Sequence, residues 1–179
     1  MSLNTPVRNW TSQRVWVVGA SSGIGLALAQ TLISLGARVA VSARRAEPLL
    51  ALASAHPQQV LALPLNMTEN ADWDSAWNNI NSAWQGADWV VFCAADYTPI
   101  RAWELNRDRA AQLIDINFTG TLRGVATVLP DFLARGSGGI AIVASVAGYM
   151  GLPKSLVYGP TKAALINFAE SLYLDVKPK

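Results

Sequence analysis

Short apolar runs alternate with segments of helical periodicity along most of the chain. Five runs are rich in β-branched and aromatic residues and predict strands buried on both faces: residues 14–20, 38–43, 59–65, 87–95 and 138–145. Between and after them, apolar positions three or four residues apart predict helices over residues 24–35, 47–56, 69–85, 103–134 and 156–176. This alternation indicates an α/β fold, a Rossmann-like doubly wound parallel sheet of at least five strands with helices on both faces.

The first strand and helix lie in a stretch without charge, residues 15–37, which is long enough to cross a bilayer. The stretch nevertheless contains four glycines, Ser21, Ser22 and Gln30, and it changes from strand to helix periodicity. Lipid offers no partner for the backbone groups of such an irregular segment. We therefore expect it to be the core of a soluble domain.

Two of the predicted helices differ in their apolar faces. The helix over 69–85 carries Trp73, Trp77, Ile80 and Trp84 at intervals of four, three and four, a stripe expected to pack into the core. The helix over 103–134 has apolar residues on more than one face. That pattern indicates burial in several directions, partly against another subunit.

Composition narrows the class of protein. The 179 residues suffice for a single domain, and a net charge of +2 without a run of Lys or Arg excludes nucleic-acid and membrane partners. One His excludes a His-based triad or a zinc cluster, so no metal is expected. Cys93 is the only cysteine, and the first residues lack a signal-peptide pattern. We expect a cytoplasmic protein with a flexible N-terminal segment over residues 1–12.

Three glycines lie between the first strand and the first helix, where a doubly wound sheet opens its ligand crevice. Gly19, Gly23 and Gly25 follow the spacing Gly-x-x-x-Gly-x-Gly, which differs from the commoner Gly-x-Gly-x-x-Gly of dinucleotide sites. Positions without a Cβ let a pyrophosphate approach the backbone, and the helix N-terminus offers unpaired N–H groups. Taken alone, the spacing also fits a tight turn.

The stretch GASSGIG resembles the glycine loop of the short-chain dehydrogenase/reductase family, whose active site combines Ser, Tyr and Lys, often with an Asn. Here Tyr158 and Lys162 stand in YGPTK, Ser145 lies thirteen residues before the Tyr, and Asn117 stands in IDINFTG. The resemblance implies that these four residues are catalytic. It also implies an oxidoreductase that transfers a hydride between a nicotinamide cofactor and a carbonyl or alcohol substrate.

The chemistry of these residues agrees with such roles. Tyr158 and Lys162 are one helical turn apart, and an ammonium beside a phenol favours the phenolate, so Tyr158 suits a general acid or base. Ser145 would donate a hydrogen bond to the substrate carbonyl. By resemblance, Asn117 would hold a water in a proton relay with Lys162. Separately, each residue has an alternative reading as a surface tyrosine, a solvated lysine, a strand end or a helix-surface residue.

The residues after the second strand bear on the cofactor. An NAD site usually has an acidic residue there, whereas this chain has Ala43 followed by Arg44 and Arg45. An arginine pairs with a 2′-phosphate, so we expect NADP(H) rather than NAD(H), with Arg44 as the main contact. The alternative is that both arginines are solvated charges.

Asn66 occupies the position of the family's Asp beside the adenine. In all, the resemblance and the residues assign the cofactor to these positions: Gly19, Ser21, Ser22, Gly23, Ile24, Gly25, Arg44, Arg45, Asn66, Met67, Cys93, Ala94, Ala95, Tyr158 and Lys162.

The sequence departs from the family in three places. Val18 replaces a Thr, residues 92–95 replace Asn-Asn-Ala-Gly, and the chain ends after the catalytic helix, where relatives continue. The expected protein is an NADP(H)-dependent oxidoreductase that reduces a carbonyl or, in the reverse direction, oxidises the alcohol. The alternatives are a non-catalytic NADP(H)-binding module and a C-terminally truncated fragment.

The remaining expectations concern partners. Tyr97, Tyr149 and Met150 are expected to border the pocket of a small-molecule carbonyl or alcohol substrate. Relatives pair through their long helices, which implies a homodimer or homotetramer through residues 103–134 and 156–176.

Overall fold

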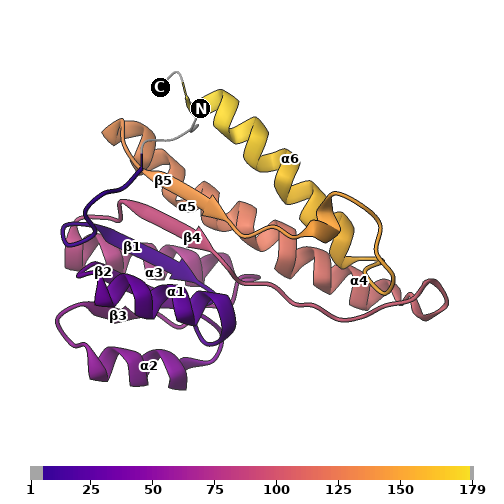
Figure 1. Cartoon of the computed structure of the whole chain (residues 1–179), viewed down its shortest axis with the longest axis horizontal. Coiled ribbons are helices and arrows are strands. Elements are labelled where there is room, and N and C mark those ends of the chain that lie inside the picture. Colours follow the sequence, from indigo (N-terminus) through magenta and orange to yellow (C-terminus); the bar gives the residue numbers. More distant parts are fainter. Residues whose placement is uncertain (1–5, 178–179) are drawn as a thin grey trace.

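Five short strands form one parallel sheet in the order β3-β2-β1-β4-β5 (Figure 1). The computed structural model describes residues 6–177. The strands are β1 (Arg14–Val18), β2 (Arg38–Ser42), β3 (Val60–Ala62), β4 (Trp89–Phe92) and β5 (Gly139–Ile142). The order reverses between β1 and β4, which opens a crevice at their carboxyl ends. The predicted doubly wound fold is confirmed.

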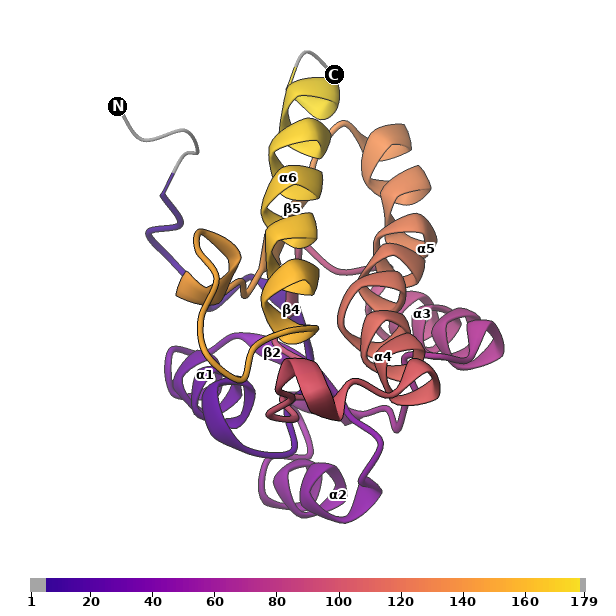
Figure 2. The ribbon, with the colours of Figure 1, turned by 90° about the vertical axis from the view of Figure 1, so that its right-hand side faces the viewer.

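Helices cover both faces of this sheet, with α1 on one side of the strands and α3 and α5 on the other (Figure 2). Two 3₁₀ turns, Ala102–Glu104 and Val146–Gly148, and a π-helical turn, Asp115–Thr119, complete the regular structure. The α-helices are α1 (Gly23–Ser34), α2 (Ala46–Ala55), α3 (Asn70–Trp84), α4 (Arg107–Ile114), α5 (Gly120–Arg135) and α6 (Tyr158–Val176).

The central strands alternate between two hydrophobic cores. In β1, Val15 and Val17 pack with α1 and α2, while Trp16 and Val18 pack with α3 and α5. This alternation follows from the period of two along a strand. Both sets are apolar because both faces are covered, which is why the run reads as continuously hydrophobic.

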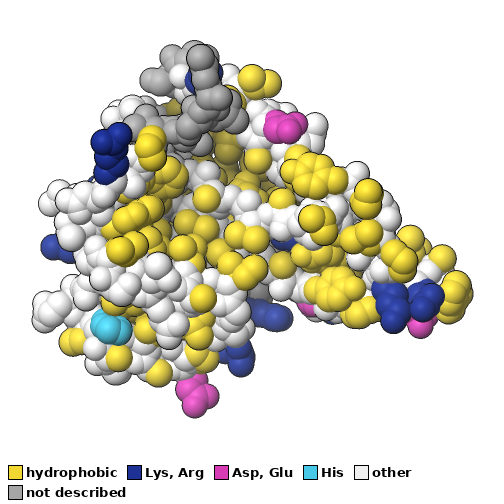
Figure 3. All heavy atoms as spheres, viewed as in Figure 1, with side chains coloured by type: hydrophobic (Ala, Val, Ile, Leu, Met, Phe, Trp, Pro, Cys, Tyr) yellow, Lys and Arg dark blue, Asp and Glu magenta, His cyan; other side chains and the backbone are white. Residues whose placement is uncertain are grey.

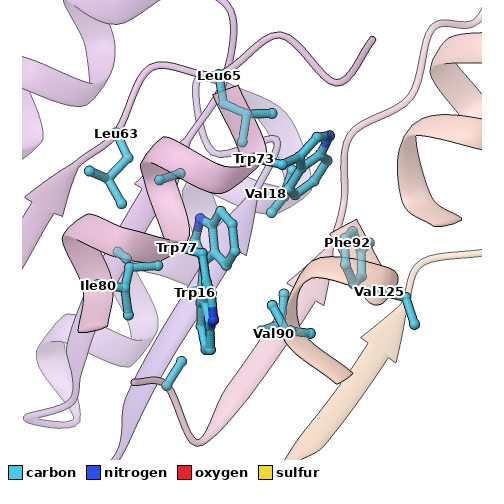
Figure 4. Close-up of a cluster of buried hydrophobic side chains, with 14 of the residues drawn as sticks. Trp16, Val18, Leu63, Leu65, Trp73, Trp77, Ile80, Val90, Phe92 and Val125 are labelled. Carbon is cyan, nitrogen blue, oxygen red and sulfur yellow. The ribbon is translucent and has the colours of Figure 1, made fainter. Parts of the chain in front are cut away.

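The core under α3 is built from tryptophans (Figure 4). The rings of Trp16 and Trp77 stack with centroids 6.0 Å apart, and Trp73 meets Trp16 edge-on at 5.6 Å. Trp73, Trp77 and Ile80 are buried, and Trp84 packs against the same cluster. The prediction that the stripe of the third helix is core is confirmed.

The prediction of one helix over residues 103–134 was wrong in its bounds. The chain is extended at Leu105 and Asn106, and α4 begins at Arg107 because the Asn106 side chain accepts a hydrogen bond from the Arg109 N–H at 2.9 Å. From there the helical path runs through the π-helical turn into α5 and ends at Gly136, whose φ is +65°. The π-helical turn leaves no trace in the apolar periodicity.

Two other boundaries differ from those predicted from the sequence. The last helix begins at Tyr158, not at residue 156, because Ser155 forms an isolated parallel bridge with Ile100. In the N-terminal segment, residues 1–5 lie outside the described residues, and Trp10 packs partly buried against the core of α1 and β2. Within residues 6–177, every helix is too short or too polar to span a membrane.

Candidate functional site

A cavity of about 490 Å³ opens at the carboxyl ends of β1 and β4, where the strand order reverses. Gly23, Tyr158 and Lys162 are absent from its lining. The other residues expected to bind the cofactor line it: Gly19, Ser21, Ser22, Ile24, Gly25, Arg44, Arg45, Asn66, Met67, Cys93, Ala94 and Ala95. Positions far apart in sequence thus converge on one crevice.

The glycine turn between β1 and α1 fits against its neighbours only because side chains are absent. Gly19 has a φ of +97°, and a Cβ there would overlap the backbone of Ala94. A Cβ on Gly25 would overlap the carbonyl of Gly19. Gly23 has a φ of +58°, with open space around it. The turn, which we call the cradle, therefore presents backbone atoms of Gly19 and Gly25, and not side chains, to the cavity.

The same turn starts α1 with features that suit an anion. No acidic residue stands in the first turn, and the Ser22 side chain makes no capping hydrogen bond. The first N–H groups of a helix have no intrahelical partner and carry partial positive charge. The arrangement suits a pyrophosphate.

Two exposed arginines follow β2 at the edge of the cavity. Arg45 Nη2 lies 3.4 Å from Ser21 Oγ and 3.5 Å from the Ser21 carbonyl oxygen, at the limit of hydrogen bonding. Arg44 makes no side-chain hydrogen bond or ion pair with any residue between 6 and 177. Its guanidinium is therefore available to a ligand.

Asn66 lines the cavity in a constrained loop after β3. Its N–H donates to Asp72 Oδ2 at 2.8 Å, and its Oδ1 accepts from the Thr68 N–H at 3.3 Å. An amide oxygen has two lone pairs, so one remains for an adenine amino group.

Tyr158 and Lys162 lie together at the start of α6. Lys162 is 2% exposed, its Nζ donates to the Val143 carbonyl at 2.8 Å, and the same Nζ lies 5.6 Å from the centroid of the Tyr158 ring. Burial lowers the pKa of the Lys162 ammonium. The catalytic pair therefore combines a half-buried phenol with a cation held in place by the backbone after β5.

Cys93 connects this pair to the cavity. Burial raises the pKa of its thiol, and the charge of Lys162 acts in the opposite direction. Lys162 Nζ donates to the Val143 carbonyl, and the Val143 N–H donates to the carbonyl of Phe92 at 2.9 Å, so the ammonium is held close to the end of β4, where Cys93 lines the cavity.

Ser145 begins the 3₁₀ turn Val146–Gly148, and its Oγ accepts from the Ala147 N–H at 3.2 Å. A Cβ on Gly148 would lie 2.9 Å from the backbone of Lys162, so this turn packs tightly on α6. Ser145 is thereby held near the catalytic pair, and its hydroxyl proton remains available because the oxygen acts as acceptor.

Asn117 lies buried in the π-helical turn, and its side chain hydrogen-bonds the backbone of the loop after β4. Its Oδ1 accepts from the Asp96 N–H at 2.7 Å, and its Nδ2 donates to the Asp96 carbonyl at 2.9 Å. Among residues 6–177, the side chain of Asn117 makes no hydrogen bond to Lys162. A water relay between the two stays a prediction from the resemblance.

Sequence reasoning missed the polar residues that shape the loop after β4. Asp96 lines the cavity and forms an ion pair with Arg109 at 2.9 Å. A carboxylate directly after a predicted strand was the available signal. Tyr97, Tyr149 and Met150, expected at the substrate pocket, are all exposed.

Within residues 6–177, no cluster of three or more His, Cys, Asp or Glu side chains is placed to hold a metal ion.

Comparison with known proteins identifies relatives. The family model described as short chain dehydrogenase matches residues 13–179. An uncharacterised oxidoreductase of Listeria monocytogenes is 34% identical over 164 residues, which cover 89% of this chain and 65% of the relative.

Solved structures agree with this similarity. A short-chain dehydrogenase from Streptomyces avermitilis superposes with a TM-score of 0.88 at 30% identity, covering 93% of this chain and 62% of that one. An actinorhodin polyketide ketoreductase variant with NADPH gives a TM-score of 0.86 at 26% identity, covering 95% and 67%. The chain spans about two thirds of the length of these proteins.

Proposed function

Because the chain belongs to the short-chain dehydrogenase/reductase family, whose members bind a nicotinamide cofactor, we propose that it carries the cofactor and catalytic residues of an NADP(H)-dependent oxidoreductase. The reaction is reduction of a carbonyl, or oxidation of the corresponding alcohol. One observation carries the proposal: Val143, whose N–H donates to the carbonyl of Phe92 directly before the cavity-lining Cys93, accepts the hydrogen bond of Lys162 Nζ at 2.8 Å. A cofactor in the cavity would thus lie next to the catalytic pair.

The residues present fit a dinucleotide phosphate. The cradle at Gly19 and Gly25 is space that a Cβ would fill, and the N-terminus of α1 faces it with unpaired N–H groups. At the end of β2, Ala43 replaces the acid that would repel a 2′-phosphate, and Arg44 is free to bind one. The solved ketoreductase with NADPH lends further support to NADP(H).

The chain's own residues then supply the proton chemistry. A bound nicotinamide supplies the hydride to the carbonyl carbon or takes it back from the alcohol. Tyr158 donates its proton to the carbonyl oxygen as the hydride arrives, and solvent reprotonates the phenolate. The Ser145 hydroxyl donates a hydrogen bond to the same oxygen, which stabilises its developing charge. Lys162 stabilises the phenolate through its fixed positive charge, and Asn117 holds the loop that closes the cavity.

A second candidate is an NADP(H)-binding module without turnover, either native or as part of a longer reductase. It is favoured by the length comparison, since the chain spans about two thirds of its relatives. It is also favoured by β5, which pairs only with β4 among residues 6–177.

We also propose that copies associate through α5 and α6, where Leu133 and Leu174 are exposed by 45% and 70%.

The test is NADPH oxidation that depends on an added carbonyl, measured by absorbance with the 179-residue chain. Replacing Tyr158 with Phe removes the proton donor and leaves the ring, so turnover should fall by about 10²- to 10⁴-fold. The affinity for NADPH should stay within about twofold of the wild type, because Tyr158 does not line the cavity. Undiminished turnover by this variant would refute the mechanism, and a wild type that binds NADPH without turnover would favour the binding module.

A further inference from the structure

The ring of Tyr97, in the loop after β4, packs edge-on against the ring of Tyr158. Their centroids are 5.0 Å apart with an interplanar angle of 78°. Tyr158 is the first residue of α6 and is only half-buried, and its ring lies against Tyr97 and Lys162 Nζ. An aromatic ring at this distance limits the rotation of the phenol about its side-chain torsions.

Tyr97 is held by the residues on either side of it. Asp96 Oδ2 pairs with Arg109 Nη2 at 2.9 Å, and Asp96 Oδ1 accepts from Thr98 Oγ1 at 3.1 Å. The same Arg109 nitrogen also donates to Thr98 Oγ1. Since Arg109 stands in the first turn of α4, both neighbours of Tyr97 are tied to one helix. We call this group, Asp96, Thr98 and Arg109, the arginine mount.

Further bonds fix the same loop at both ends. Before Tyr97, the side-chain amide of Asn117 hydrogen-bonds both the N–H and the carbonyl of Asp96. After Tyr97, the Ile100 N–H donates to the Lys154 carbonyl at 2.9 Å, and Ile100 bridges to Ser155, three residues before Tyr158. The loop that carries Tyr97 and the segment that leads into Tyr158 are therefore joined directly.

We propose that Tyr97 is a positioning residue that sets the orientation of the Tyr158 phenol, and that the arginine mount holds Tyr97 in place. The proposal rests on the proposed function, because it concerns the proton donor of that reaction. One ion pair and five hydrogen bonds hold the segment from Asp96 to Ile100, so the backbone on both sides of Tyr97 is fixed. Tyr97 is 54% exposed, so its outer surface remains open to substrate while one edge restrains Tyr158.

Three variants test the proposal in the intact chain. Tyr97→Phe keeps the ring and should keep kcat within about twofold of the wild type, whereas Tyr97→Ala should lower kcat by roughly tenfold or more, because small misplacements of reacting groups are costly. The KM for NADPH should not change in either variant. Trp103→Ala is the matched control, since Trp103 is an aromatic residue of the same loop that is 78% exposed. Its kcat should equal that of the wild type.

A second measurement does not depend on turnover. With ¹³C-labelled tyrosine, the three-bond couplings that report the χ1 torsion of Tyr158 should move toward rotamer-averaged values in Tyr97→Ala and in Arg109→Met, and should not change in Trp103→Ala. A change of chemical shift alone is not sufficient, because loss of the Tyr97 ring current alters the Tyr158 shifts without any motion. Unchanged Tyr158 couplings in Tyr97→Ala would overturn the inference, as would an unchanged kcat in that variant of an active enzyme. A wild type without turnover would instead overturn the proposed function, and the couplings alone would then decide whether Tyr97 orients Tyr158.

Discussion

The part of the molecule proposed to bind the cofactor, built on β1, β2, β4 and α1, is packed differently from the part that carries Tyr158 and Lys162, built on β5 and α6. We call these parts the cofactor half and the catalytic half after their proposed roles. In β1 and β2 every residue after the first is buried, whereas all residues of β5 are half-buried. In α6 the buried residues end at Leu165, within the first half of the helix. Hydrophobic side chains are visible on the molecular surface over β4 and β5 (Figure 3).

The two halves are also held by different interactions. The glycine turn is fixed by close packing between backbone segments: Gly19 packs against the backbone of Ala94, and Gly25 packs against the carbonyl of Gly19. The catalytic residues are held by side chains, through Lys162 on Val143 and Tyr97 on Tyr158. The comparison teaches that the shape of the crevice at the glycine turn is set by the backbone, while the side chains proposed as catalytic are held by a few specific contacts.

The largest loss of stability and of cofactor binding should come from a side chain added where two backbone segments of the cofactor half touch. Gly25→Ala places a methyl group against the Gly19 carbonyl, so either the turn or α1 must move. We expect a loss of about 1–3 kcal/mol in unfolding free energy and loss of saturable NADPH binding, measured by denaturation and titration. Gly151→Ala is the control, because open space surrounds that position. Equal behaviour of the two variants would show that the turn is not tightly fitted.

A more selective effect should come from the arginine at the end of β2. Arg44→Ala removes the expected partner of the 2′-phosphate, and a charge-assisted pair of this kind corresponds to about 10- to 100-fold in affinity. We expect that loss for NADPH and almost none for NADH, in parallel titrations of the two cofactors. Arg38→Ala, an exposed arginine at the start of β2, should change neither affinity. Equal losses for both cofactors would contradict the assignment.

The smallest effect concerns the buried ammonium of the catalytic half. Burial lowers the pKa of Lys162 in the folded chain, so the folded state binds this proton less tightly than the unfolded state. The cost of the buried charge is fully present below the lowered pKa and disappears as pH rises toward the ordinary value of 10.5. The wild type should therefore gain stability relative to Lys162→Met between pH 7 and pH 10.

The measurement is the difference in Tm between these two proteins at each pH. We expect this difference to move in favour of the wild type as the pH rises. Lys154→Met, which alters an exposed lysine, should show no such trend. A Tm difference that moves the opposite way with pH would mean that the ammonium is stabilised in the folded state.

The cofactor crevice was largely predictable from the sequence because short-range rules determine it. Buried parallel strands read as apolar runs, and the order of the elements places the turn at Gly19 next to the loop at Cys93. Twelve of the fifteen residues expected at the cofactor site line the cavity for this reason. Tyr158 and Lys162 also came together as expected, because a helix brings positions four apart to one side.

The missed features depend on irregular backbone. The π-helical turn at Asp115–Thr119 shifts the phase of the long helix, but apolar residues lie on more than one face of that helix, so the apolar pattern does not locate the turn. The hydrogen bonds of Asn117 with the backbone of Asp96 were not foreseen either, because they depend on the path of the loop after β4. The contact of Tyr97 with Tyr158 likewise follows from the bridge at Ile100 and the ion pair of Asp96, neither of which has a local signature.

The central claim is that residues 6–177 contain a complete crevice for NADP(H). The most direct test is a fluorescence titration of the folded chain with NADPH and then NADH, using its seven tryptophans as reporters. The account predicts saturable binding with NADPH preferred by about tenfold or more. Absence of binding to both cofactors, or a preference for NADH, would contradict it.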